Sequence, residues 1–382
     1  MKKIINVVGA RPQIIKSSAI SRAIAEKFPD QLQEVILHTG QHYDENMSAV
    51  FFRELGIPQP HHQMKVGGGS HAEQLAMMIT GIDDIIQKEQ PDVMLVYGDT
   101  NSTLAASIMA SRHFLPIVHV EAGLRSYNKR MPEEVNRITC DHLSTMLFVP
   151  TKQGIDNLRR EGFDVDYAGP YSADHPLVSL CGDVMYDNSL YFADRAESHV
   201  EVFQKHHLKS GNFVLLTVHR DFNTDHPERM SGILHGVMDF IEKYNLPVLF
   251  PIHPRTQKNL SLEVYSELEK RMDAEPRLVL VPPVSFLEMT ALEKHCRMVF
   301  TDSGGVQKEA YYFGKPCLIL RPETEWVELL EVGAALLAGH HREKIVAQAE
   351  LLLQTNMAAM PALYGDGKAA VSICAQILRH LA

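Results

Sequence analysis

The chain alternates short, almost wholly apolar runs with longer stretches of helical periodicity, and this alternation restricts its fold more than any other feature. Such runs are typical of parallel strands that are buried on both faces and joined by crossover helices. Helices are predicted over residues 12–26 and 71–87. Strands are predicted over residues 3–8, 34–38, 93–97, 117–120, 146–149, 213–218, 248–252, 278–281, 298–300 and 317–320. The sequence therefore predicts an α/β protein with two doubly wound parallel sheets.

An aromatic, Gly- and Pro-rich stretch over residues 163–179 interrupts this alternation, and we expect an irregular crossing there. A chain of 382 residues is also too long for one ordinary core. We therefore expect an N-terminal domain over residues 1–175 and a C-terminal domain over residues 176–364. A last helix within residues 365–382 would be free to pack back on the first domain.

Charge and cysteine usage narrow the class of partner. The chain has 37 basic and 47 acidic residues, a net charge of −10, which argues against a nucleic acid or an anionic membrane as partner. The N-terminus begins directly with a strand pattern and no apolar run reaches transmembrane length, so we expect a cytoplasmic protein. The five cysteines are far apart and no Cys/His spacing is typical of zinc. We expect reduced thiols and no metal site.

Polar residues follow the first-half strands, at the edge where open α/β sheets bind ligands. Arg11 lies at the mouth of a helix, where its charge opposes the helix dipole at a cost of roughly 0.3 to 1 kcal/mol unless an anion faces it. An exposed arginine with no ligand is the alternative. Asp99 and Glu121 each follow a strand, although Asp99 also fits a helix N-cap. Glu133 begins a helix, where the dipole favours an acid in any case. These residues are candidate ligand-binding and acid–base groups.

In the second half, His219 follows a strand, and a structural histidine is the alternative interpretation. The most specific feature is the run over residues 300–310, in which a strand enters a turn of small residues that opens a helix. Backbone N–H groups of residues 303–305 can then approach a diphosphate at the positive end of that helix. Glu309 is placed to reach the hydroxyls of a ribose. Neither the G-x-G-x-x-G motif nor the P-loop motif is present.

Taken together, these motifs resemble the non-hydrolysing UDP-N-acetylglucosamine 2-epimerase family over essentially the whole chain. The matching motifs cover residues 9–16, 38–42, 98–101, 119–125, 131–134, 301–305 and 313–316. The resemblance implies a GT-B-like arrangement, with two Rossmann-like domains facing a central cleft and UDP held mainly by the C-terminal domain. It also implies a homodimer, a UDP-linked amino sugar as substrate, and no cofactor, metal or nicotinamide.

The resemblance further implies roles for individual residues. The catalytic set would be Asp99, Glu121, Glu133 and His219. The substrate-binding set would be Arg11, Lys16, Phe286, Ser303, Gly304, Gly305, Glu309 and Trp326. In the family's reaction, UDP leaves by anti elimination with loss of the C2 proton, and syn addition of UDP to the bound glycal returns a proton to the opposite face. Carboxylates near the ring suit this chemistry, because cleavage at C1 builds positive charge on the sugar.

The sequence departs from the N-acetylglucosamine branch after Arg321. That branch usually reads Thr-Glu-Arg-Pro-Glu there, whereas this chain has Trp326, its only tryptophan, in place of the cation. This feature is similar to the branch that epimerises UDP-2,3-diacetamido-2,3-dideoxyglucuronate for surface polysaccharides. The uronate is therefore a second candidate substrate beside UDP-N-acetylglucosamine.

Three other functions remain open at the level of sequence. A GT-B glycosyltransferase shares the architecture but needs an acceptor, and carboxylates clustered in the N-terminal half favour elimination over transfer. A hydrolysing epimerase would release free sugar and UDP. A sugar-nucleotide sensor would not need Asp99, Glu121 and Glu133 together.

Overall fold

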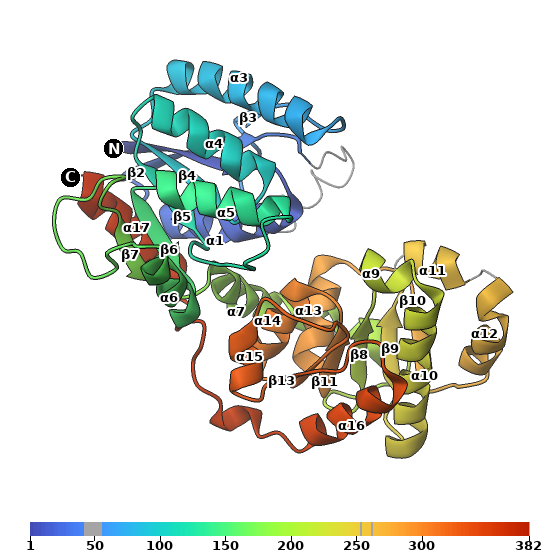
Figure 1. The fold of residues 1–382 in the computed structure, drawn as a ribbon. Coiled ribbons are helices and arrows are strands. Elements are labelled where there is room, and N and C mark those ends of the chain that lie inside the picture. Colours follow the sequence, from blue (N-terminus) through green and yellow to red (C-terminus); the bar gives the residue numbers. More distant parts are fainter. Residues whose placement is uncertain (42–55, 253, 261–262, 382) are drawn as a thin grey trace. The chain divides into compact units, whose positions relative to one another are not determined.

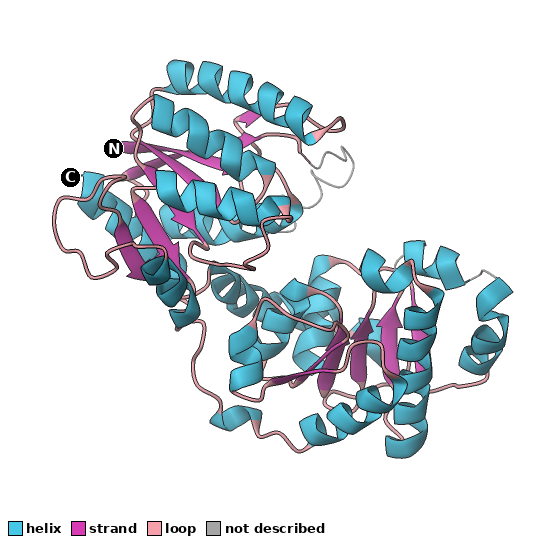
Figure 2. Cartoon of the chain, viewed as in Figure 1, coloured by secondary structure: helices cyan, strands magenta, loops and turns pink. Residues whose placement is uncertain are grey.

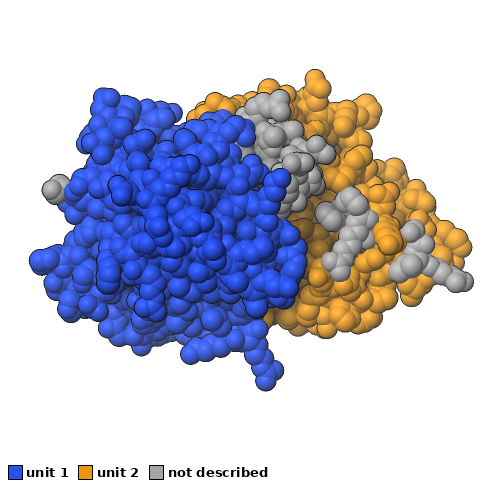
Figure 3. Space-filling model, turned by 90° about the horizontal axis from the view of Figure 1, so that it is seen from above, with its two compact units in different colours: residues 1–188, 362–382 blue, residues 189–361 orange. Residues whose placement is uncertain are grey.

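The computed structural model of the chain describes residues 1–41, 56–252, 254–260 and 263–381. These residues form two compact units (Figures 1 and 2). Unit 1 comprises Met1–Asn188 with Ala362–Ala382, and unit 2 comprises Ser189–Pro361; Figure 3 colours them separately.

Unit 1 is built on a seven-stranded, wholly parallel sheet in the order β3-β2-β1-β4-β5-β6-β7. Its strands are β1 (Lys2–Val8), β2 (Leu32–His38), β3 (His62–Gln63), β4 (Val93–Tyr97), β5 (Ile117–Val120), β6 (Met146–Val149) and β7 (Leu177–Leu180). Strands β2 and β3 lie on one side of β1, and β4 to β7 lie on the other, so the strand order reverses between β1 and β4. This reversal is the topological switch point, where ligands bind in such sheets.

Helices cover both faces of this sheet (Figure 1). They are α1 (Arg11–Lys27), α3 (His71–Glu89), α4 (Asn101–Arg112), α5 (Pro132–Leu143), α6 (Lys152–Arg160) and α17 (Ala369–Leu381). One face carries α3, α4 and α5, and α1 and α17 pack together on the other. Three helices begin at residues whose side chains accept a backbone N–H, namely Ser70, Thr100 and Thr151.

The chain passes between the units within helix α7 (Val184–Ala196) and again between Pro361 and Ala362. Asp187 accepts the N–H groups of Ala369 and Ala370, which begin α17, at 3.1 and 2.8 Å, while burial raises its pKa to about 6.

The expected boundary between residues 175 and 176 precedes β7, whereas the units divide after Asn188. Residues 177–179, expected to be irregular, pair with β6 as part of β7. This short, half-buried edge strand lacks the continuous apolar signal of a central strand.

Unit 2 is built on a six-stranded parallel sheet in the order β10-β9-β8-β11-β12-β13. Its strands are β8 (Val214–Thr217), β9 (Val248–Pro251), β10 (Leu278–Val281), β11 (Met298–Thr301), β12 (Cys317–Ile319) and β13 (Ala335–Leu337). The switch point lies between β8 and β11. The two predicted parallel sheets are confirmed.

The helices of unit 2 also cover its sheet on both faces (Figure 2). Besides the end of α7, they are α8 (Glu201–Gln204), α9 (Asp221–Thr224), α10 (Pro227–Tyr244), α11 (Pro254–Leu260), α12 (Ser266–Asp273), α13 (Phe286–His295), α14 (Gly304–Tyr312), α15 (Val327–Glu331) and α16 (Arg342–Leu353). Helices α10 and α16 pack together over a core that includes Leu216, Ile233 and Phe300. In the described part of the chain, no helix combines the length and the apolar character needed to cross a bilayer.

Candidate active site

The switch point of unit 1 brings Lys16 and Glu121 together above Gly98. Lys16, on α1, forms an ion pair with Glu121, which follows β5, and each side chain is only about a tenth exposed. A Cβ placed on Gly98 would lie 3.2 Å from Glu121 Oε2 and 3.4 Å from Lys16 Nζ. Gly98 also has a φ of +59°, which favours glycine. The turn after β4 therefore forms the floor beneath this ion pair.

Glu121 has a left-handed backbone, with a φ of +71°. This conformation is uncommon for a residue with a side chain and costs on the order of 1 to 3 kcal/mol. The surrounding turn holds it in place, since the N–H groups of Glu121 and Ala122 both donate to the Phe148 carbonyl at 3.1 Å. Strain of this kind clusters at functional sites, and here it directs a carboxylate to the ligand edge of the sheet.

Asp99 lies beside this pair and is held by helix α5. Arg137 forms an ion pair with the Asp99 carboxylate, and Asn136 Nδ2 donates to the Asp99 carbonyl at 2.8 Å. Thr100, not Asp99, is the N-cap of α4. Because the Asp99 side chain is 30% exposed and does not cap the helix, it is available to a ligand.

The two adjacent acids that begin α5 have different environments. Glu134 is buried and accepts the N–H groups of Ser126 and Tyr127, each at 2.8 Å. Burial alone would raise the pKa of Glu134, but these hydrogen bonds and Arg137 lower it below its usual value. Glu133 is exposed and makes no hydrogen bond or ion pair within the described part of the chain. Glu133 and Arg137 are four residues apart and so share a helix face. Glu133 is thus the acid of the two that a ligand can reach.

The turn between β1 and α1 is held close to the end of β4. Gln13, which is 2% exposed, accepts the Gly9 and Ala10 N–H groups at 2.9 and 3.1 Å and donates to the Tyr97 carbonyl at 2.9 Å. A Cβ on Gly9 would meet Ser102 Oγ at 2.1 Å, so only glycine fits. The exposed Arg11 follows this turn and begins α1. The motif over residues 38–42 is described only as far as residue 41, because residue 42 lies outside the described residues.

In unit 2, the switch point holds His219 against Asp302. The Asp302 carboxylate is fully buried and accepts the N–H groups of His219 and Arg220, Asn223 Nδ2 at 3.0 Å, and His219 Nδ1 at 3.0 Å. Burial alone would raise the pKa of Asp302. The hydrogen bond and charge of His219, the hydrogen bond from Asn223 and the N–H of Arg220 instead lower this pKa below its usual value. The His219 side chain is 41% exposed. Asp302 therefore fixes the Nδ1 edge of the His219 ring, and the rest of the ring stays accessible.

The turn after β11 forms the start of helix α14. Ser303 is the N-cap but makes no side-chain cap hydrogen bond, which leaves the first N–H groups of the helix for an anion. Trp326 is 6% exposed and donates its indole N–H to the Gly304 carbonyl at 2.9 Å. Lys308 Nζ lies 4.2 Å from the centre of the Trp326 ring. The structure thus places Trp326 beneath this turn as a support, while Gly305 is exposed.

Glu309 and Phe286 lie farther along the same edge of unit 2. A Cβ on Gly305 would lie 4.0 Å from Glu309 Oε2, so this carboxylate points back toward the start of α14. Burial, and then the charge and hydrogen bond of Glu309, raise the pKa of Glu293 well above its usual value. Phe286 begins α13 and packs edge-on against Phe192, with ring centres 5.1 Å apart.

Within each unit, the structure brings most of the predicted residues together. In unit 1, helix α1 and the turns after β4 and β5 bring Lys16, Glu121 and Asp99 together, while Glu133 lies on α5 one turn before Arg137, the partner of Asp99. In unit 2, one turn joins His219, Ser303, Gly304 and Trp326. The sequence reasoning missed the supporting residues Gln13, Arg137 and Asp302. Only Asp302 had a clear signal, because it follows a strand at the switch point. In the described residues, no group of three or more His, Cys, Asp or Glu is arranged to hold a metal ion.

Comparison with protein families gives a match to the model described as UDP-N-acetylglucosamine 2-epimerase over residues 25–378. Among curated relatives, a UDP-2,3-diacetamido-2,3-dideoxy-D-glucuronate 2-epimerase of Pseudomonas aeruginosa is 44% identical, covering 97% of this chain and 98% of that one. A UDP-N-acetylglucosamine 2-epimerase of Methanocaldococcus jannaschii is 39% identical, covering 91% of each chain.

Solved structures agree with the relatives. A Methanocaldococcus jannaschii UDP-GlcNAc 2-epimerase in complex with UDP-GlcNAc and UDP has a TM-score of 0.81 at 37% identity, covering 99% of this chain and 100% of that one. Phytolacca americana UGT2, complexed with UDP-2fluoro-glucose and pterostilbene, has a TM-score of 0.63 at 11% identity and covers both chains fully, which bears on the fold alone. The expected GT-B-like fold is confirmed.

Proposed function

Since the chain belongs to the UDP-N-acetylglucosamine 2-epimerase family, we propose that it inverts C2 of a UDP-linked N-acetylated amino sugar without hydrolysing it. The observation that carries this proposal is the group of Asp99, Glu121 and Lys16 at the switch point of unit 1. A group with two carboxylates and a cation suits a reaction that removes a proton, builds positive charge on a sugar ring and returns a proton.

The two units contribute different parts of the chemistry. Unit 2 binds UDP: the start of α14 at Ser303, Gly304 and Gly305 holds the diphosphate, Glu309 takes the ribose hydroxyls, and Phe286 faces the pyrimidine. His219, oriented by Asp302, stabilises the departing diphosphate. Trp326 acts on the substrate through the Gly304 carbonyl that it supports.

Unit 1 supplies the acid–base groups of the proposed reaction. Asp99, Glu121 and Glu133 are the candidates that remove and return the C2 proton, and Arg11 and Lys16 add positive charge for the diphosphate. Elimination of UDP breaks the C1–O bond as the C2 proton leaves, which forms a bound glycal. Re-addition of UDP restores the C1–O bond and places a proton on the opposite face of C2.

We propose two candidate substrates: first UDP-N-acetylglucosamine, which the name of the relative at 39% identity gives, and second UDP-2,3-diacetamido-2,3-dideoxyglucuronate. The relative at 44% identity, whose name gives the uronate, favours the second, as does Trp326 in place of a cation. Either product would serve as a precursor for a surface polysaccharide.

Incubation with each UDP-sugar in D₂O tests the proposal and separates the substrates. We expect deuterium at C2 of an intact UDP-sugar, followed by NMR, and the sugar that exchanges is the substrate. Release of free sugar and UDP would show hydrolysis. Transfer of the sugar to an acceptor with C2 protium retained would show a glycosyltransferase.

From the family membership we also propose that the chain acts as a homodimer. Sedimentation velocity is expected to give about twice the 43.0 kDa mass of one chain. A single species at the mass of one chain, across the concentrations at which the enzyme is active, would contradict this assembly.

A further inference from the structure

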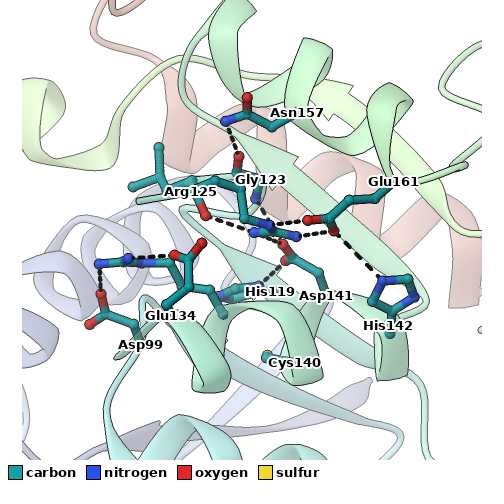
Figure 4. Close-up of polar contacts among 12 residues, drawn as sticks. Asp99, His119, Gly123, Arg125, Glu134, Cys140, Asp141, His142, Asn157 and Glu161 are labelled. Atoms are coloured by element: carbon teal, nitrogen blue, oxygen red, sulfur yellow. Dashed lines mark hydrogen bonds and ion pairs between the residues drawn. The ribbon is translucent and has the colours of Figure 1, made fainter. Parts of the chain in front are cut away.

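A buried charged network lies behind the acid–base groups of unit 1. It consists of His119, Asp141, Arg125 and Glu161, and we call it the His119–Glu161 network (Figure 4). His119 Nδ1 lies 2.6 Å from Asp141 Oδ1, and Arg125 reaches Asp141 Oδ2 at 2.7 Å. Arg125 also holds both oxygens of Glu161 at 2.7 Å. The side chains of His119, Asp141 and Arg125 are fully buried, and only Glu161 is partly exposed.

His119 carries a hydrogen on both ring nitrogens. His119 Nε2 lies 2.8 Å from the Gly98 carbonyl, which only accepts hydrogen bonds, so Nε2 must donate. Nδ1 faces the Asp141 carboxylate and donates as well. Burial acts to lower the pKa of His119, but the facing Cys140 and Asp141 raise it well above its usual value. The network therefore alternates two cations with two anions.

The network connects the two turns that carry the catalytic carboxylates. His119 holds the carbonyl of Gly98. Gly98 precedes Asp99 in the sequence and lies beneath the Lys16–Glu121 pair. Through Asp141 Oδ2 the network accepts the Gly123 N–H at 3.1 Å, two residues after the left-handed Glu121. Asp141 belongs to α5, which also holds Asp99 through Asn136 and Arg137.

We propose that His119 and Asp141 are positioning residues of the C2 epimerisation, which hold the Gly98 and Gly123 turns so that Asp99 and Glu121 keep the geometry that proton transfer requires. The proposal rests on the function proposed above. Neither residue touches the substrate, because both side chains are fully buried.

Two physical arguments favour positioning over simple stabilisation of the core. Buried ion pairs are weak contributors to stability, and apolar side chains of similar volume often serve the fold equally well. A network of buried charges is better explained by the geometry that it enforces. Glu121 also needs such enforcement, because a strained backbone persists only when the surrounding structure over-determines it.

The test compares kcat, KM and UDP affinity in two variants, His119→Gln and Asp141→Asn. Each keeps a side chain of similar size but removes the charge and at least one hydrogen bond of the network. We expect kcat for C2 exchange to fall about 10²-fold, because a misplacement near 1 Å has an effect of that size. The dissociation constant of UDP, measured by calorimetry, should change little, because unit 2 binds UDP.

Matched controls come from a second His–Asp pair of unit 1. His113 Nε2 lies 2.5 Å from Asp83 Oδ1, and both side chains are partly exposed and joined to neither turn. His113→Gln and Asp83→Asn should keep kcat near the wild-type value. A kcat that falls equally in the network and control variants would overturn the proposal, as would wild-type kcat in a folded His119→Gln protein.

Glu161→Gln keeps the proposal testable if the buried variants do not fold. Its carboxylate is 23% exposed, so its loss should be tolerated, yet it weakens the hold of Arg125 on Asp141. We expect a smaller fall in kcat with unchanged UDP affinity, and an unchanged kcat would count against positioning.

The assay separates failure of this inference from failure of the proposed function. If the wild-type protein shows no C2 exchange, the proposed function itself fails. If wild type and variants exchange equally, only this inference fails.

Discussion

Glu121→Gln is expected to lower kcat for C2 epimerisation by roughly 10²- to 10⁴-fold, the range for a positioned acid–base group. Glutamine keeps the size of the side chain but can neither accept nor return a proton, and it removes the ion pair with Lys16. UDP affinity should be retained, because the turn that we propose to hold the diphosphate belongs to unit 2. Stopped assays with NMR give kcat, and calorimetry gives the dissociation constant of UDP.

Glu228→Gln is the matched control for this variant. Glu228 lies in the first turn of α10, and its side chain is 69% exposed. Its replacement should leave kcat near the wild-type value. A near-normal rate in a folded Glu121→Gln protein would remove Glu121 from the mechanism.

Asp302→Ala is expected to lower the free energy of unfolding by about 3 to 5 kcal/mol, because several hydrogen bonds to a buried carboxylate are lost together and each contributes about 1.5 to 3 kcal/mol. Asp302 is fully buried, and its loss leaves the N–H groups of His219 and Arg220 and the amide of Asn223 without their acceptor. The ring of His219 also loses the carboxylate that orients it, so kcat should fall as well. Urea unfolding and the exchange assay measure the two effects.

The pH dependence of stability provides a second readout for Asp302. Its pKa is lower in the folded protein than its usual value, so its contribution is present above the unfolded pKa and is lost as pH falls through the folded pKa. The stability difference between wild type and Asp302→Ala should therefore shrink at acid pH. Asp273→Ala, at an exposed position at the end of α12, should change stability by less than about 0.5 kcal/mol. An Asp302→Ala protein as stable as this control would contradict the role of Asp302.

The contrast between Glu133 and Glu134 shows where sequence reasoning stops. Both acids begin the same helix, and the dipole favours both equally. Only the packed structure separates them: Glu134 turns inward to accept the backbone of residues 126 and 127, while Glu133 remains exposed. Asp99 is a similar case, since its partner Arg137 is 38 residues away.

The sequence by itself determined the two parallel sheets and the residues that follow their central strands, because apolar runs and turn-forming residues act over a few neighbouring positions. The short edge strands β3, β7 and β13 were not predicted, because they carry little of that local signal. Only the tertiary structure decided that Lys16 and Glu121, 105 residues apart, form an ion pair above Gly98, and that Asp302 orients His219. Such pairs depend on which strands become neighbours and how deeply each side chain is buried, and no local pattern encodes either.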